Sequence, residues 1–232
     1  MTMTTIETGA RRTHAHALTF PPRRAAFTII ELLTVIGIIA ILVAILIPTV
    51  GKVRQSANDN RTRALFSQVI TAIESYRQEY GYYPTFEYGN QSENVFLLGD
   101  EVDIDHVFFT TLTGRQLDGS RIDDQNHPNP RGIQLFSFSE SDLVRRGTGQ
   151  PPKLVDAYGN EEIVIIVDRN QRGVIRPQDL STVPEVSSVR TPNVSVAPEI
   201  PQDGIRAGVL MYSAGAGGGS ADNARQNLVR SW

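Results

Sequence analysis

The first 80 residues contain two hydrophobic patterns that follow one another directly. Phe27–Val50 is a run of 24 residues in which Glu31 is the single charged side chain. As a helix this run would be roughly 36 Å long, at about 1.5 Å per residue, which is enough to cross the ~30 Å hydrocarbon core of a bilayer. Residues 27–50 are therefore predicted to form a transmembrane helix.

The second pattern is amphipathic. From Lys52 to Tyr80 the chain has no proline or glycine, and apolar residues recur at about every fourth position, which places one apolar stripe on a polar helix. Gly81 follows as expected for a C-terminal cap. We predict one helix over 27–80, kinked or loosened at Pro48, whose second half (51–80) packs on the rest of the chain. The stripe consists of Leu65, Val69, Ala72 or Ile73, Tyr76 and Tyr80.

Beyond Gly81 the pattern changes to short segments. Apolar residues spaced by four predict a short helix around 103–112, which Gly114 ends. Residues 177–204 contain five prolines among Ser, Thr and Val, which is typical of an irregular loop. Strands are predicted for the β-rich runs at 132–138, 162–168 and 207–213. The predicted fold class is α+β, with a long N-terminal helix packed on a small antiparallel sheet.

Charge is distributed unevenly along the chain. Residues 1–26 carry four arginines and Glu7, a net charge of +3, so the remainder carries −6. A basic leader before an apolar helix orients its N-terminus toward the cytoplasm and exports the head, residues 51–232. The apolar run is too long for a cleavable secretory h-region of about 7–15 residues.

Composition removes several classes of function. An acidic head lacks the clustered basic residues that nucleic-acid binding requires. Because the chain has no cysteine, it has no disulfide, no cysteine-based zinc site and no thiol nucleophile. We find no pairing of nucleophile and base that predicts an enzyme.

The stretch "AFTIIELLTVIGIIAILVAILIP" resembles the class III signal and N-terminal helix of type IV pilins and type II secretion pseudopilins. Phe27 stands where the mature chain of that family begins, Glu31 is the fifth mature residue and Pro48 the twenty-second. The resemblance implies that a prepilin peptidase cuts between Ala26 and Phe27 and methylates the new amine of Phe27. Ala26 departs from the glycine that usually precedes the cut.

Three further segments are similar to the major pseudopilin: "YRQEYGYYPT" (76–85), "LVDAYGNE" (154–161) and the C-terminal "MYSAGAGGGSADNARQNLVRSW" (211–232). In that protein the C-terminal loop is a calcium site. Asp222 is the one acid of the loop that remains here, and because calcium takes six to eight oxygen ligands, its isolation argues against a bound ion. No other cofactor is expected.

Glu31 has two interpretations. As a carboxylate near the start of a membrane helix, it could extend toward the interface. Acids within membranes usually have a partner, however, and the resemblance implies one: the positively charged amine of Phe27 on a neighbouring subunit.

The resemblance implies a structural subunit of a type II secretion pseudopilus, with a cytoplasmic N-terminus and a periplasmic head at the bacterial inner membrane. Its partners would be other pseudopilins, the prepilin peptidase, an inner-membrane platform protein and a secretion ATPase. Two alternatives are a type IV pilus pilin for adhesion, motility or DNA uptake, and an exported binding domain for which the helix is only a tether. The absence of cysteine favours the secretion type, because pilin heads commonly close with a disulfide.

Overall fold

The computed structural model describes residues 27–87, 93–147 and 149–232, with the backbone alone described at Pro48 and Thr49. The chain divides into two compact units, 1–48 and 49–232. Helix α1 (Ile29–Tyr80) contributes to both, and the helical assignment is continuous through Pro48. The predicted helix over 27–80 is therefore confirmed to within two residues. Whether Pro48 kinks it remains a prediction.

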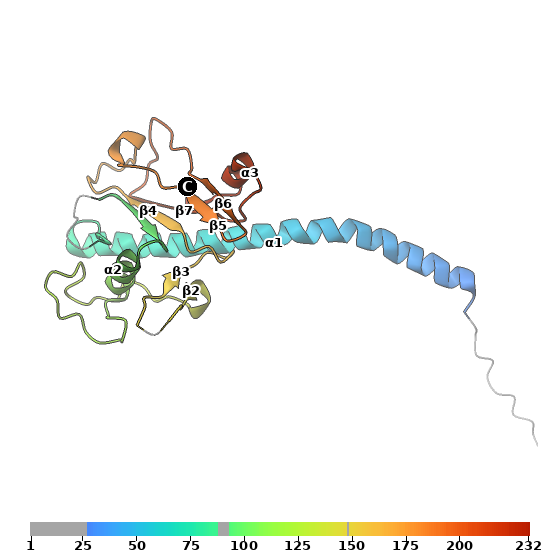
Figure 1. The fold of residues 1–232 in the computed structure, drawn as a ribbon, viewed down its shortest axis with the longest axis horizontal. Coiled ribbons are helices and arrows are strands. Elements are labelled where there is room, and N and C mark those ends of the chain that lie inside the picture. The colour runs from blue at the N-terminus through green and yellow to red at the C-terminus, as the bar shows by residue number, and fades with distance from the viewer. Residues whose placement is uncertain (1–26, 88–92, 148) are drawn as a thin grey trace, which may run out of the picture. The chain divides into compact units, whose positions relative to one another are not determined.

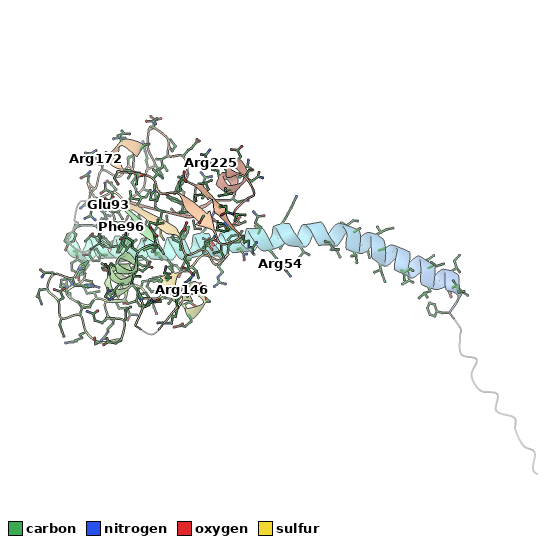
Figure 2. All side chains as sticks on the ribbon, in the orientation of Figure 1. Arg54, Glu93, Phe96, Arg146, Arg172 and Arg225 are labelled. Atoms are coloured by element: carbon green, nitrogen blue, oxygen red, sulfur yellow. The ribbon has the colours of Figure 1, made fainter. Side chains whose placement is uncertain are left out.

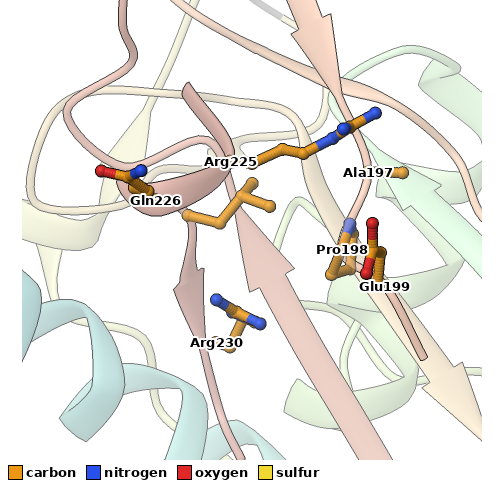
Figure 3. Close-up of a pocket in the computed structure, with 7 residues that line it drawn as sticks. Ala197, Pro198, Glu199, Arg225, Gln226 and Arg230 are labelled. Carbon is orange, nitrogen blue, oxygen red and sulfur yellow. The ribbon is translucent and has the colours of Figure 1, made fainter. Parts of the chain in front are cut away.

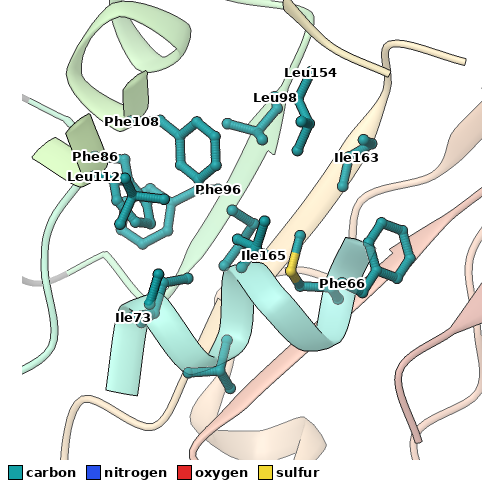
Figure 4. Close-up of a cluster of buried hydrophobic side chains, with 14 of the residues drawn as sticks. Phe66, Ile73, Phe86, Phe96, Leu98, Phe108, Leu112, Leu154, Ile163 and Ile165 are labelled. Atoms are coloured by element: carbon teal, nitrogen blue, oxygen red, sulfur yellow. The ribbon is translucent and has the colours of Figure 1, made fainter. Parts of the chain in front are cut away.

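In the second unit, α1 forms the base of the hydrophobic core. The predicted stripe is buried from Leu65 to Tyr76, and Phe66 and Ile73 are completely covered. They pack against apolar side chains of the sheet, among them Ile163 and Ile165 (Figure 4). The helix ends where predicted, because Gly81 adopts a positive φ of 82° and donates its N–H to the carbonyl of Arg77 at 2.8 Å.

A four-stranded antiparallel sheet lies on this helix, in the order β1-β4-β7-β8 (Figure 1). The strands are β1 (Val95–Leu98), β4 (Ile163–Val167), β7 (Val209–Ser213) and β8 (Val229–Arg230). Strands β4 and β7 pair in full register, from Ile163 opposite Ser213 to Val167 opposite Val209. They confirm the predicted strands at 162–168 and 207–213, and the α+β class is confirmed with them.

Every residue of β4 and β7 is buried, which means that both faces of the sheet are covered. Because successive side chains of a strand point to opposite faces, Ile163 and Ile165 face α1, while Val164 and Ile166 face away from it. The second face packs against Val186 and Val196 in a separate core cluster. The head therefore has three layers: helix α1, the four-stranded sheet, and a further layer of residues that covers the far face of the sheet.

That further layer corrects the prediction of an irregular loop at 177–204. The segment contains β5 (Val186–Ser188) and β6 (Thr191–Val196), which pair antiparallel as a hairpin. Pro192 lies within β6, which a two-stranded sheet tolerates because the strand has an unpaired edge. The prolines in this segment indicated an irregular loop. The segment is ordered because the apolar far face of β4 and β7 has to be covered.

Helix α2 (Val102–Thr113) confirms the predicted short helix, and Gly114 ends it with φ 66°. The predicted strand at 132–138 is wrong. That segment has no regular secondary structure and lies beside α2, where the N–H groups of Leu135 and Phe136 both donate to the carbonyl of Leu112 at 2.9 Å. Its aromatic side chains pack on those of α2, for example Phe138 on Phe108, so its hydrophobicity serves helix packing and not a strand ladder.

The remaining elements are short. They are the 3₁₀ turns η1 (Glu140–Asp142) and η2 (Pro177–Asp179), the paired strands β2 (Leu143–Val144) and β3 (Lys153–Leu154), and helix α3 (Ala221–Gln226) near the C-terminus.

Candidate functional site

The N-terminal part of α1 exposes an apolar surface along its described length. Ile29, Ile36 and Leu46 are 80%, 52% and 58% exposed. Among the described helices, α1 is the one that is long and apolar enough to span a membrane. Thr34, a polar residue of the span, donates its hydroxyl to the carbonyls of Ile30 and Glu31 and so needs no external partner.

Thr28 and Glu31 cap the N-terminus of α1 through reciprocal hydrogen bonds. Oε2 of Glu31 accepts from the backbone N–H and from the hydroxyl of Thr28, both at 2.8 Å. In return, the hydroxyl of Thr28 accepts from the backbone N–H of Glu31 at 3.3 Å. This is a capping box, which satisfies N–H groups that the first turn of a helix leaves unpaired. The T-x-x-E spacing of Thr28 and Glu31 is typical of this cap, whereas the hydrophobic pattern predicts no local partner for Glu31.

The capping box uses half of the Glu31 carboxylate. Both bonds from Thr28 reach Oε2, and Oε1 has no hydrogen-bond partner among the described residues. One residue can therefore hold the helix start and keep an acceptor for a second group. Of the other residues predicted for processing and assembly, Phe27 is described and is 79% exposed. Ala26 and the side chain of Pro48 lie outside the described residues.

The C-terminal loop, which resembles a calcium site of the major pseudopilin, is closed by side-chain amides. Asn160 donates its Nδ2 to the carbonyl of Gly215 at 2.8 Å, and Asn227 donates its Nδ2 to the carbonyl of Gly217 at 2.6 Å. Asp222 lies exposed in the first turn of α3. Within the described parts of the chain, no cluster of three or more His, Cys, Asp or Glu residues could hold a metal. The carbonyls of Gly215 and Gly217 thus each accept an amide N–H within the head.

The turn at Asp156–Asn160, part of the 154–161 segment singled out by resemblance, fixes this loop to the sheet. Asp156 is 4% exposed, and its Oδ1 accepts from the N–H groups of Tyr158 (2.8 Å) and Asn160 (2.9 Å). Its Oδ2 accepts from Asn160 Nδ2 at 2.7 Å and from the hydroxyl of Ser213 at 2.8 Å. Burial raises the pKa of Asp156, and these hydrogen bonds oppose the rise because they stabilise the charged form.

Tyr158 joins the same turn to α1. Its hydroxyl donates to Oδ1 of Asp59 at 2.6 Å and lies 2.9 Å from the carbonyl oxygen of Gln55. Burial, followed by the hydrogen bond to Asp59, raises the pKa of Tyr158, which therefore stays protonated as a donor. The backbone N–H of Ala157 donates to Thr62 Oγ1 on the next turn of the helix. Helix, sheet and C-terminal loop thus meet at one five-residue turn.

Comparison with known proteins identifies the N-terminal segment. Residues 21–47 match the family model described as the prokaryotic N-terminal methylation motif. A search of curated proteins and of solved structures found no match. The match covers the end of the basic leader and most of the apolar span, including Phe27 and Glu31. Residues 21–47 therefore carry a type IV pilin-like signal, which is the signal of structural subunits and not of enzymes, and which fits anchoring in the inner membrane.

Proposed function

We propose that this chain is a structural subunit of a type II secretion pseudopilus, most similar to the major pseudopilin. The observation that carries the proposal is Glu31, a lone carboxylate in an apolar span most of which lies within the matched methylation motif. Prepilin peptidase would cut between Ala26 and Phe27 and methylate the amine of Phe27. The span would then hold the subunit in the inner membrane, with its acidic head in the periplasm.

Assembly would use the carboxylate oxygen that the capping box leaves open. Thr28 occupies Oε2 of Glu31, so Oε1 can accept from the charged amine of Phe27 on a neighbouring subunit. The box needs only residues 28–31, so cleavage before Phe27 leaves it intact. In lipid, this pairing lowers the cost of an intramembrane carboxylate, and it sets the axial register between adjacent helices.

The same apolar surface would serve two environments in succession. In the membrane, the side chains of the span contact lipid. In a fibre they would contact the spans of other pseudopilins, because lipid tails and apolar side chains are similarly apolar and packing favours the tighter neighbour. Extraction would be driven by a cytoplasmic secretion ATPase acting through an inner-membrane platform protein.

A type IV pilus pilin is the second candidate, because the matched motif is that of pilins and pseudopilins in general. The chain has no cysteine with which to close its C-terminal region by a disulfide, and this favours the secretion type. Deleting the gene distinguishes the two: loss of protein export with unchanged motility and DNA uptake supports the pseudopilus, and the reverse supports the pilus.

The mass of the mature N-terminus tests processing. The expected species begins with N-methylated Phe27. A chain that keeps residues 1–26, or one cut beyond residue 50, would contradict the proposal.

Three variants then separate assembly from capping. Glu31→Gln keeps an oxygen for the capping box but removes the charge, and we expect it to insert in the membrane and fail to form fibres. Thr28→Val removes the capping hydroxyl but keeps the Glu31 charge, so fibres should still form. Glu101→Gln, a charge change at an exposed residue of the head, is the control. Normal fibres from Glu31→Gln would refute the pairing between Glu31 and the amine of Phe27.

A further inference from the structure

The head carries a basic surface where α1 enters it. Residues 49–63 include four basic residues and one acid, although residues 27–232 as a whole carry −6. Lys52 and Arg54 are exposed, as is Arg225 on α3. None of these three forms an ion pair among the described residues, whereas Arg61, farther along α1, pairs with Asp142 at 2.8 Å. We call Lys52, Arg54 and Arg225 the basic collar.

A hydrogen bond brings α3 to the beginning of the head. Gln55 Nε2 donates to Oδ1 of Asn227, the C-cap residue of α3, at 3.1 Å. Lys52 lies three residues before Gln55 and thus on the same face of α1, toward α3. Arg54 lies seven residues before Arg61 and shares its face, on the side of η1. The basic collar therefore places positive charge on two sides of α1. Arg54 and Arg225 of the collar are labelled in Figure 2.

Beside α3 the surface is hollowed into a groove of about 230 Å³. Arg225 of α3, Arg230 of β8 and Glu199 are among the residues that line it (Figure 3). An arginine that lines a groove suits the oxygen atoms of a phosphate group, since its guanidinium presents several N–H donors in one plane. Asp222, the exposed acid of α3, and Glu199 limit the excess of positive charge on this surface.

The position of the collar in the chain indicates its partner. Lys52 and Arg54 follow Val50, the last residue of the apolar run, by two and four residues, and so come at the depth of lipid headgroups. An acidic head would be repelled by an anionic membrane surface, yet Lys52 and Arg54, the first basic residues after the apolar run, are exposed and form no ion pair among the described residues. We propose that the basic collar binds the phosphate groups of anionic phospholipids on the leaflet that the head faces. This rests on the proposed membrane anchoring.

Such binding would hold the head against the bilayer before assembly. Each basic residue near an anionic surface strengthens binding about fivefold (about 1 kcal/mol). Extraction into a fibre must break these contacts, so the collar would favour the membrane-resident subunit over the fibre and would make the balance depend on lipid composition. Because surface charges are screened over about 8 Å at physiological salt, the effect should weaken at higher ionic strength.

The test uses the full chain in nanodiscs of phosphatidylcholine alone or with phosphatidylglycerol. Co-elution with the discs first establishes insertion. Hydrogen exchange of residues 221–227 is then measured, because this segment carries Arg225 but neither Lys52 nor Arg54. We expect exchange about tenfold slower in the anionic discs, and the difference should disappear at 0.5 M salt, where the screening length is only about 4 Å.

A matched pair of variants completes the test. Lys52→Gln/Arg54→Gln should reduce the difference between the two discs to less than about twofold. Arg115→Gln/Arg121→Gln, the same charge change in the exposed loop after α2, should leave it unchanged. Equal exchange in both discs from an inserted chain would overturn the lipid proposal and leave the anchoring standing. Protection that is independent of lipid charge but rises with protein concentration would also overturn it, in favour of the acidic surface of a second copy. A chain that does not insert refutes both.

Discussion

Replacing Asp105 by asparagine tests the electrostatics of the head. Asp105 is 2% exposed on α2, and its Oδ1 accepts from the N–H of Gly99 at 2.9 Å. Its Oδ2 is buried and has no hydrogen-bond partner among the described residues. Burial, opposed by the bond from Gly99 and by the charge of Lys153, raises the pKa of Asp105 from the ordinary 3.8 to about 6, and the carboxylate of Glu161 adds to the rise.

The sign follows from proton binding. Since the folded state binds the proton of Asp105 more tightly than the unfolded state, its contribution to stability is complete below about pH 4 and is lost as pH rises through 6. The shift of about two pKa units corresponds to about 3 kcal/mol in total, at about 1.4 kcal/mol per unit. Between pH 8 and pH 5 the folded head should gain about 1.4 kcal/mol from this group alone, or about 3–6 °C in Tm.

The assay is thermal unfolding of the full chain in a neutral detergent at several pH values, for wild type and Asp105→Asn. The difference between the two slopes isolates Asp105 from Asp156 and His127, whose pKa values burial also moves. We expect wild type to gain stability from pH 8 to pH 5 relative to the variant. Parallel pH profiles would refute the reasoning, because they would mean that the Asp105 carboxylate titrates alike in the folded and unfolded chain.

Three other substitutions test the C-terminal loop and its turn by the same unfolding measurement. Gly215→Ala should cost about 2 kcal/mol or more, since Gly215 has φ 57° and an added Cβ would lie 2.2 Å from the carbonyl oxygen of Asn227; a neutral effect would mean that the loop is not held in this conformation. Asn160→Asp should cost about 3 kcal/mol at pH 7 by setting a second carboxylate against Asp156, and the loss should shrink as the pH is lowered; an undiminished loss at pH 4 would exclude charge repulsion as its cause. Tyr158→Phe should cost about 1.5 kcal/mol through the loss of its hydrogen bond to α1, and an unchanged Tm would show that water replaces that bond.

Sequence was sufficient wherever the determining residues are neighbours in the chain. The apolar run at 27–50 and the stripe of 51–80 set the long helix, because a helix is formed by local hydrogen bonds and its buried face repeats every three to four residues. The methylation motif, which includes Phe27 and Glu31, was predictable for the same reason, because it is contiguous in the chain. Even the capping box was encoded locally, by the spacing of Thr28 and Glu31, although hydrophobic pattern alone did not reveal it.

Tertiary structure decided what depends on residues far apart in the chain. The prolines of 177–204 indicated an irregular loop, yet the segment forms the β5–β6 hairpin, because the apolar far face of β4 has to be covered. Residues 132–138 have the composition of a strand, but in the structure they pack on α2 and do not pair with a described strand. Hydrophobic composition predicts that a segment will be buried. Its conformation depends on the element of the fold against which it packs.

In the C-terminal loop, too, the sequence pattern and the fold indicate different interactions. From sequence, Asp222 was the residue to consider, since calcium sites are built from acids. In the folded chain the loop carbonyls accept from Asn160 and Asn227, the first of which lies 55 residues away from the glycine that it contacts. The sequence by itself determined the span, its processing motif and its lone acid, all of them local. Only the fold determined which polar groups satisfy one another inside the head, because those pairs are made by strands that bring distant residues together.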